Sequence, residues 1–218
     1  MYFKVKNIQQ YITPGTGLIE HYIFRPIIAY LIYKFKFNIN PNLITIFSLF
    51  YAIFCSILIL TKKYAILGAF LYIFFGFIDL LDGAIARFYN RKSKLGAFLD
   101  GLVDLLAEII ILISLGYYFN KLNYFLFLAS FILFSHYLSI RLKWIYGIKE
   151  RQTNIFNYIN NPIHFFILLL KRNDTRKIFL VIGLLLNSWK FILFYFLFIY
   201  IISIFSTIKI ILNGGKYE

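Results

Sequence analysis

Apolar residues run in long blocks along the chain, and charged residues gather in the shorter segments between those blocks. A helix that crosses a bilayer needs about 20 predominantly apolar residues, with a range of about 17–25. Six stretches approach or exceed this length, over residues 42–61, 64–88, 95–119, 122–146, 174–189 and 191–212. The pattern therefore predicts an all-α integral membrane protein with six transmembrane helices.

Two other apolar segments are expected to lie on the membrane surface. Residues 21–37 interleave apolar side chains with Arg25, Lys34 and Lys36, which predicts an N-terminal interfacial helix on the cytoplasmic side. Residues 152–170 carry no charge but contain four asparagines. Counting them as a span would place the basic residues that follow on the outside, so we expect a second interfacial helix there.

The composition supports this membrane assignment. Of the 218 residues, 61% are hydrophobic and 15% are charged, whereas soluble domains are about 45–50% apolar and about 25% charged. This excludes an ordinary soluble enzyme, and the 27 Phe and 18 Tyr exclude a disordered chain. We expect an N-terminal cytoplasmic segment at residues 1–40 and one six-helix catalytic domain at residues 41–213. The single cysteine, Cys55, excludes an intramolecular disulfide.

The net charge of +14 has to be divided among the loops before it can be interpreted. Of the 23 Lys and Arg residues, 19 fall in alternate segments: the two termini, the stretch 87–94 and the stretch 141–177. By the positive-inside rule these segments face the cytoplasm, so both termini are predicted to be cytoplasmic, in a protein of the cytoplasmic membrane. The charge thus indicates topology and attraction to anionic lipid, and no nucleic-acid partner is expected.

Four aspartates lie inside or beside these apolar stretches. Asp79 and Asp82 are three residues apart at the end of the second predicted helix, and Asp100 and Asp104 are four apart at the start of the third, so each pair shares a helix face. The connection over residues 89–94 is short, which makes the two helices antiparallel neighbours. Clustered carboxylates in an apolar setting need a cation, and oxygen ligands favour Mg²⁺, Mn²⁺ or Ca²⁺.

Small residues accompany these aspartates at fixed spacings. The stretch reads Asp79-x2-Asp82-Gly83-x2-Ala86-Arg87-x8-Gly96-x3-Asp100-x3-Asp104. This resembles the signature of the CDP-alcohol phosphotransferases, D-x2-D-G-x2-A-R-x8-G-x3-D-x3-D, at every fixed position and in every gap. Pro41-Asn42-x2-Thr45 is also similar to the usual entry of that family into its first span. The layout of residues 40–212 resembles the family as a whole.

The resemblance implies an enzyme of phospholipid biosynthesis that transfers a phosphatidyl or other phospho-alcohol group from a CDP-alcohol to an acceptor hydroxyl, with release of CMP. CDP-diacylglycerol is the expected donor. By analogy with the family, two Mg²⁺ or Mn²⁺ ions are held by the four aspartates, and Asp104 also serves as the general base. Gly83, Ala86, Arg87 and Gly96 are expected to contact the CDP-alcohol, and a homodimer is expected.

The acceptor is expected to be a small polar alcohol. Arg141 and Lys143, at the predicted cytoplasmic end of the fourth span, are candidate ligands for an acceptor phosphate, with a positive-inside anchor as the equal alternative. The segment from Arg172 to Arg176 could line the same entrance. These basic residues favour inositol phosphate or glycerol 3-phosphate over serine or diacylglycerol.

Other readings of the intramembrane aspartates stay open at this point. They could serve a metal- or proton-coupled transporter, an intramembrane prenyltransferase, or a non-catalytic scaffold descended from the enzyme. A prenyltransferase would carry a second aspartate-rich motif on a distant helix, which the sequence lacks. Glu108 lies outside the signature, and we expect it to bond to a neighbouring helix.

Overall fold

A computed structural model describes residues 18–36, 39–146, 162–170 and 172–212 of the chain. Every regular element in these ranges is a helix, which confirms the predicted all-α class. The elements are the π-helical turn η1 (Glu20–Phe24), α2 (Arg25–Phe35), α3 (Pro41–Leu60), α4 (Ala65–Ile73), α5 (Phe75–Phe88), α6 (Lys94–Tyr118), α7 (Leu122–Ile145), α8 (Pro162–Leu170), α9 (Asn173–Leu185) and α10 (Trp189–Leu212).

Local sequence signals fix the ends of the two helices that start beside the aspartates. α3 begins at Pro41, whose missing N–H costs nothing at a first helical position, and the Asn40 side chain accepts a hydrogen bond from the Asn42 N–H at 3.1 Å. The Ser93 hydroxyl caps α6 by accepting from the Gly96 N–H at 2.9 Å. Between α5 and α6, Asn90 adopts a positive φ of 53°, a common way to end a helix.

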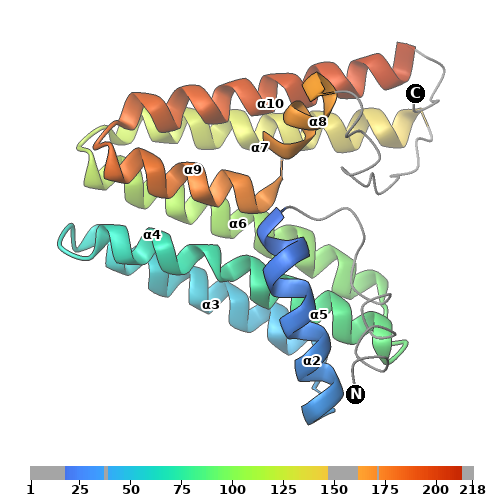
Figure 1. The fold of residues 1–218 in the computed structure, drawn as a ribbon. Coiled ribbons are helices and arrows are strands. Elements are labelled where there is room, and N and C mark those ends of the chain that lie inside the picture. Colours follow the sequence, from blue (N-terminus) through green and yellow to red (C-terminus); the bar gives the residue numbers. More distant parts are fainter. Residues whose placement is uncertain (1–17, 37–38, 147–161, 171, 213–218) are drawn as a thin grey trace.

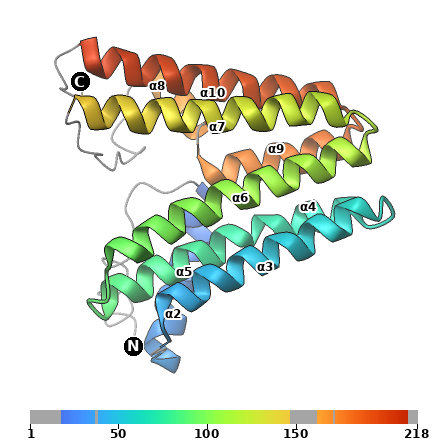
Figure 2. The same cartoon turned by 180° about the vertical axis from the view of Figure 1, so that it is seen from behind.

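The long helices run side by side as a bundle (Figures 1 and 2). α3 packs against α4, α5 and α6, while α7, α9 and α10 pack together on the other side. α6 contacts both α3 and α7, and α4 contacts α9, so these pairs join the two sides. One buried apolar cluster, which includes Ala107, Leu112 and Phe196, fills the space between them.

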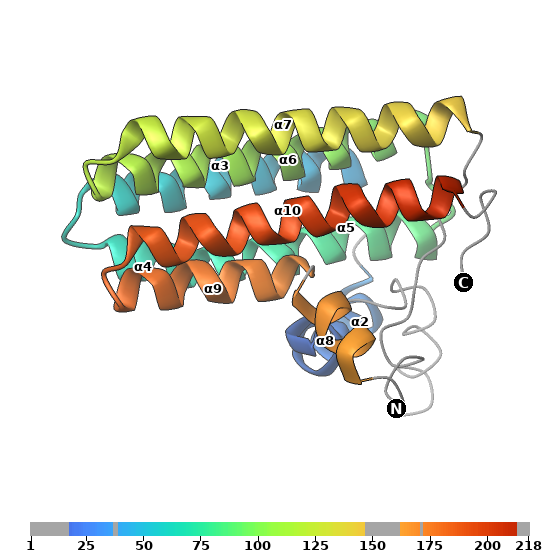
Figure 3. The same cartoon turned by 90° about the horizontal axis from the view of Figure 1, so that it is seen from above.

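The N-terminal helices are arranged differently from the rest of the bundle. α2 runs across the bundle and not along it, and both η1 and α2 contact α5 (Figures 1 and 3). Phe24, Ile28 and Ile32 on this segment are buried against a second apolar cluster that includes Leu80 and Ile85 of α5. The segment is therefore packed directly onto the helix that carries the first aspartate pair.

Four helices of the described part are long and apolar enough to cross a membrane, namely residues 41–60, 65–88, 122–142 and 189–209. The second of these comprises α4 and α5, which the sequence had predicted as one uninterrupted helix. α6 has 25 residues and sufficient length, but Lys94, Asp100, Asp104 and Glu108 make it more polar. α9 has only 13 residues, about 20 Å of helix. Four of the six predicted spans therefore qualify on length and composition among the described residues, and the count of six is not confirmed.

The turns of the bundle collect at its two ends. The α3–α4, α6–α7 and α9–α10 turns lie at one end, on the left of Figure 1. The α5–α6 turn and the end of α10 lie at the opposite end. α8 falls in the segment predicted as an interfacial helix, and residues 152–161 of that segment lie outside the described part of the chain.

Candidate active site

Three aspartates from two helices meet beside the α5–α6 turn. Each of Asp79, Asp82 and Asp100 offers a carboxylate oxygen, and these oxygens all lie within 4.8 Å of one another. The i,i+3 spacing on α5 and the antiparallel approach of α6 produce this arrangement, as the sequence predicted. Asp82 is the most buried of the three, and it accepts a hydrogen bond from Thr45 Oγ1 of α3 at 2.6 Å.

A pocket of about 200 Å³ opens next to this cluster, between α3, α5 and α6. Its described lining consists of Pro41, Asn42, Thr45, Asp82, Gly83, Ala86, Arg87, Arg91, Lys92, Ser93, Gly96, Ala97 and Asp100. Six of the signature positions therefore line one hollow. Small residues make the room: a Cβ at Gly83 would lie 3.0 Å from the Arg87 guanidinium, and a Cβ at Gly96 would lie 3.0 Å from Asn42 Oδ1.

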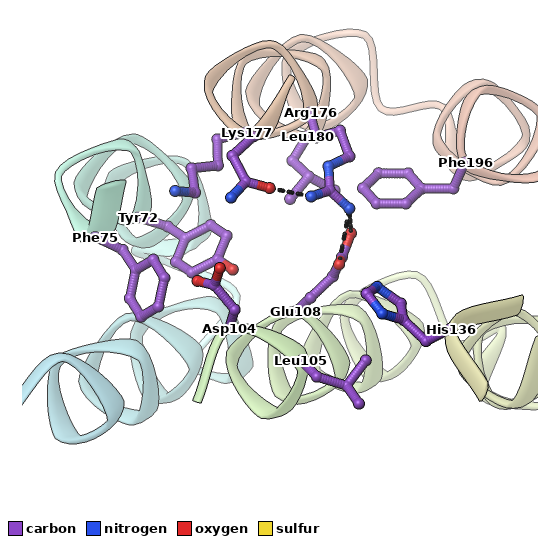
Figure 4. Close-up of a pocket in the computed structure, with 11 residues that line it drawn as sticks. Tyr72, Phe75, Asp104, Leu105, Glu108, His136, Arg176, Lys177, Leu180 and Phe196 are labelled. Atoms are coloured by element: carbon purple, nitrogen blue, oxygen red, sulfur yellow. Dashed lines mark hydrogen bonds and ion pairs between the residues drawn. The ribbon is translucent and has the colours of Figure 1, made fainter. Parts of the chain in front are cut away.

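Asp104 belongs to a second, smaller pocket one helical turn further along α6. This pocket measures about 100 Å³, and α4, α5, α6, α7, α9 and α10 all contribute to its wall. Asp104, Glu108, Arg176 and Lys177 are its charged residues (Figure 4). The site is thus a pair of neighbouring pockets, with Asp100 lining one and Asp104 lining the other.

Glu108 and Arg176 form an ion pair across the second pocket. Nη1 of Arg176 donates to both carboxylate oxygens of Glu108, at 2.8 and 2.9 Å. The Tyr200 hydroxyl donates to Glu108 Oε2 at 2.7 Å, and the Asn173 side chain accepts from Nη2 of Arg176. The network joins α6, α9 and α10, which confirms the expectation that Glu108 bonds to a neighbouring helix.

Lys177 is the other cation of this pocket, and its side chain is only 5% exposed. Its ammonium lies 4.9 Å from the ring centroid of Phe75 and 5.6 Å from that of Tyr72. Such cation–π contacts compensate part of the hydration that a buried lysine loses. Lys177 was counted in the sequence only as a charge that sets topology, so the structure assigns it to a very different environment.

The sequence profile described as CDP-alcohol phosphatidyltransferase matches residues 38–208, which is most of the chain and includes both pockets. The chain belongs to this family. The family and the long apolar helices together indicate an integral membrane protein. The predicted family and the all-α fold class are therefore confirmed.

Three relatives match shorter parts of the chain. An uncharacterized protein of Aquifex aeolicus is 38% identical over 85 residues, which is 38% of this chain and 42% of the relative. The archaetidylinositol phosphate synthase of Methanothermobacter thermautotrophicus is 38% identical over 96 residues, 41% of this chain and 49% of that protein. The one of Pyrococcus horikoshii is 34% identical over 79 residues, 36% of this chain and 42% of that protein. Each alignment spans less than half of the relative.

The donor set of the aspartate cluster suits a hard divalent cation. Three carboxylates offer only oxygen, and their spacing lets one ion contact all of them. Asp104 is not part of this group of three, although its place on the next turn of α6 keeps it close. The cluster fits the metal expected of the family, and the participation of Asp104 as a ligand stays a prediction.

The structure describes the side chain of only one of the two candidate acceptor residues on α7. Arg141 is exposed and does not line either pocket within the described residues. The side chain of Lys143 lies outside the described residues. Their role in acceptor binding stays a prediction, whereas Arg176, from the segment that the sequence also suggested, does line the pocket of Asp104.

Two residues beside the site had no assigned role in the sequence. Thr45 was noted as part of the entry to the first span, and its hydroxyl bonds directly to Asp82. Glu20 lies in the N-terminal segment and is only 7% exposed, which is unusual for a carboxylate unless it is paired. Glu20 directly precedes the predicted interfacial helix, residues 21–37, and nothing in the sequence indicated that it would be buried.

Proposed function

We propose that the protein transfers a phosphatidyl-type group from a membrane-embedded CDP-alcohol to the hydroxyl of a small, phosphate-bearing alcohol and releases CMP. The donor is CDP-diacylglycerol or an ether-lipid analogue, and the acceptor is an inositol phosphate or glycerol 3-phosphate. The observation that carries this proposal is the pair of adjacent pockets, one lined by the signature residues and the other by Asp104 with buried cations.

The larger pocket supports the donor half of the proposal. Gly83, Ala86 and Gly96 leave room for the cytidine monophosphate part to approach the helix backbones, and Arg87 supplies a guanidinium for its phosphates. Arg91 and Lys92, which are exposed at the rim, add positive charge that attracts a diphosphate. The lipid tails of the donor would remain among the apolar helix surfaces, in the bilayer.

Asp79, Asp82 and Asp100 would hold Mg²⁺ or Mn²⁺ beside the diphosphate, with Asp104 as a further ligand if two ions bind. A bound divalent cation would supply neutralisation of the charge that develops on the departing CMP. Within the chain, Thr45 fixes the orientation of Asp82 through its hydrogen bond.

Asp104 would take the proton of the acceptor hydroxyl. The hydroxyl oxygen then bonds to the phosphorus that carries the lipid alcohol, and the bond from that phosphorus to the oxygen of CMP breaks. CMP leaves with the electron pair, and the acceptor becomes a phosphodiester of the lipid. Proton transfer to a positioned carboxylate contributes about 10²–10⁴-fold to such reactions.

The smaller pocket supports a phosphate-bearing acceptor. Lys177 and Arg176 both line it, and the Arg176 Nε is buried with no hydrogen-bond partner among the described residues. An anionic group in the pocket could accept from this N–H and attract the Lys177 ammonium. Two of the relatives carry the name archaetidylinositol phosphate synthase, which supports an inositol phosphate as the acceptor.

The remaining features of the proposal concern the whole protein. The site end of the bundle, with the α5–α6 turn, would face the cytoplasm, so that a water-soluble acceptor meets a lipid donor there. Both termini would then be cytoplasmic, and the catalytic unit, residues 41–213, would work as a homodimer. The excess of Lys and Arg in the corresponding segments supports this orientation.

CMP release by the purified protein tests the proposal. The assay contains CDP-diacylglycerol, Mg²⁺ or Mn²⁺, and one acceptor at a time: inositol 1-phosphate, glycerol 3-phosphate, inositol or serine. We expect metal-dependent CMP release with a phosphorylated acceptor and none with inositol or serine. Release with serine or inositol alone would contradict the acceptor class, and no release with any acceptor would contradict the proposed activity.

A further inference from the structure

Lys177 and Asp104 line the same small pocket, yet no ion pair joins them among the contacts of the described residues. Opposite charges attract strongly in an environment with little water. A lysine ammonium on its four-carbon stem is also mobile enough to reach alternative partners. Something must therefore favour the observed position of the Lys177 ammonium over a pair with Asp104.

The observed position lies over Gly76 of α5. A Cβ added to Gly76 would be 2.9 Å from Lys177 Nζ and 3.5 Å from Glu20 Oε1. The two charged groups therefore both lie above a residue that has no side chain, and no direct ion pair between them is found among the described contacts. The rings of Phe75 and Tyr72 border the same place, at 4.9 and 5.6 Å from Nζ. Glycine makes the space, and Glu20 supplies the negative charge there.

Glu20 comes from η1, outside the part of the chain that matches the family profile, which begins at residue 38. Its position is fixed by a contact with α9: the Ile19 N–H donates to Asp174 Oδ2 at 2.9 Å. Asp174 is 2% exposed and lies one helical turn before Lys177. Burial lowers the pKa of the nearby Arg172, and the charges of Glu20 and Asp174 oppose that shift. The N-terminal segment is thus attached to the helix that carries Lys177.

We propose that Glu20, together with the space at Gly76, holds the Lys177 ammonium away from Asp104. Glu20 is then a positioning residue supplied by the N-terminal segment, and it leaves Asp104 available for the acceptor hydroxyl and Lys177 for the acceptor phosphate. The functional consequence rests on the proposed function, whereas the placement of Lys177 does not. Residues 18–35 would accordingly contribute to the site from outside the proposed catalytic unit, residues 41–213, and would not be only a membrane anchor.

Gly76→Ala and Glu20→Gln test this proposal in complementary ways. The alanine Cβ displaces only the far end of a flexible side chain and leaves every charge in place, so the variant is expected to fold. Glu20→Gln removes the charge and keeps the shape. Gly101→Ala, on α6, is the matched control, because a Cβ there meets nothing within 4 Å.

The main measurement is thermal unfolding of the full-length protein in nanodiscs against Mn²⁺ concentration. A lysine ammonium that moves toward Asp104 also approaches the aspartate cluster and weakens cation binding. We expect the half-saturating Mn²⁺ concentration to rise about threefold or more in both variants and to stay unchanged in the control. With CDP-diacylglycerol and acceptor, kcat should fall while the donor KM stays within about twofold of the wild type.

The decisive comparison uses variants that also carry Lys177→Gln. In Gly76→Ala/Lys177→Gln and Glu20→Gln/Lys177→Gln, the half-saturating Mn²⁺ concentration should equal that of Lys177→Gln alone, because no ammonium remains to be displaced. A rise that persists in this background would overturn the proposal. So would a rise in Glu20→Gln without one in Gly76→Ala, which would indicate a simple loss of negative charge.

The same design separates this inference from the proposed function. If the wild-type protein releases no CMP with any acceptor, the proposed function fails. The Mn²⁺ titrations still decide the placement of Lys177, because they require no turnover.

Discussion

Thr45 Oγ1 donates a hydrogen bond of 2.6 Å to Asp82 Oδ2, across the interface between α3 and α5. Both residues are buried, at 4% exposure each, so water does not replace this bond. Thr45 Oγ1 also lies 3.2 Å from the Pro41 carbonyl oxygen, one turn earlier in the same helix. The first transmembrane helix thus sets the orientation of a carboxylate that it does not carry.

Thr45→Val removes this hydrogen bond and keeps the shape of the side chain. Groups that orient a metal ligand are worth about 10–100-fold in metal affinity or activity when they are lost. We expect the half-saturating Mn²⁺ concentration to rise about tenfold, measured by thermal unfolding against metal concentration. Thr45→Ser keeps the hydroxyl and should behave as the wild type. Equal defects in both variants would show that packing, and not the hydrogen bond, is responsible.

Substitution of Asp104 should affect CMP release and Mn²⁺ binding differently from substitution of Asp82. Asp82 belongs to the group whose oxygens lie within 4.8 Å of one another, and Asp104 does not. Asp104→Asn should therefore reduce CMP release about 10²–10⁴-fold and retain most of the stabilisation by Mn²⁺. Asp82→Asn should lose both. If Asp104→Asn abolishes the response to Mn²⁺ as completely as Asp82→Asn, Asp104 is a metal ligand first and the predicted four-aspartate set is correct.

The sequence predicted the helices and the aspartate cluster well because both depend on local spacing. Five predicted spans agree with helices to within a few residues, and three of the four aspartates meet where antiparallel helices had to bring them, while Asp104 lies one turn further along α6. The break at Phe74 between α4 and α5 carries no proline or polar residue that would signal it. α9 ends at Leu185, short of the predicted span, where Asn187 adopts a positive φ of 47°.

Contacts between distant segments were much harder to predict. Glu108 was expected to bond to another helix, but its partner, Arg176, is 68 residues away, and nothing in the spacing indicates which cation that is. Glu20 and Lys177 are further apart still, and both had been assigned to the cytoplasmic surface. Charge counting locates a residue near a membrane boundary and says nothing about whether a helix turns it inward.

Gly83→Ala should affect the donor more than the acceptor. The added Cβ would lie 3.0 Å from both terminal nitrogens of Arg87, which must move within a pocket of about 200 Å³. One methyl group in a fitted site costs about 10-fold or more in discrimination. We expect the KM for CDP-diacylglycerol to rise about tenfold and the acceptor KM to stay within twofold. Gly101→Ala is again the control, and an unchanged donor KM would contradict the assignment of this pocket.

The Glu108–Arg176 ion pair should stabilise the fold only while both of its charges are present. The two side chains are 12% and 18% exposed, so removal of one partner leaves the other charge largely without water. Glu108→Gln should lower the free energy of unfolding by about 3–5 kcal/mol, measured as a fall in Tm in detergent. The double variant Glu108→Met/Arg176→Met should recover most of that loss. A double variant as unstable as the sum of the single variants would show that the two residues act independently.

The orientation of the bundle in the membrane can be tested by labelling cysteines introduced at its two ends. Cys55 is 0% exposed within α3, so the native protein should resist a membrane-impermeant maleimide. Lys63 and Lys92 are exposed at opposite ends of the bundle, in the α3–α4 and α5–α6 turns (Figure 1). If the site faces the cytoplasm, intact cells should label Lys63→Cys and not Lys92→Cys, and permeabilised cells should label both. The reverse pattern would place the aspartate cluster on the outer side, away from cytoplasmic acceptors.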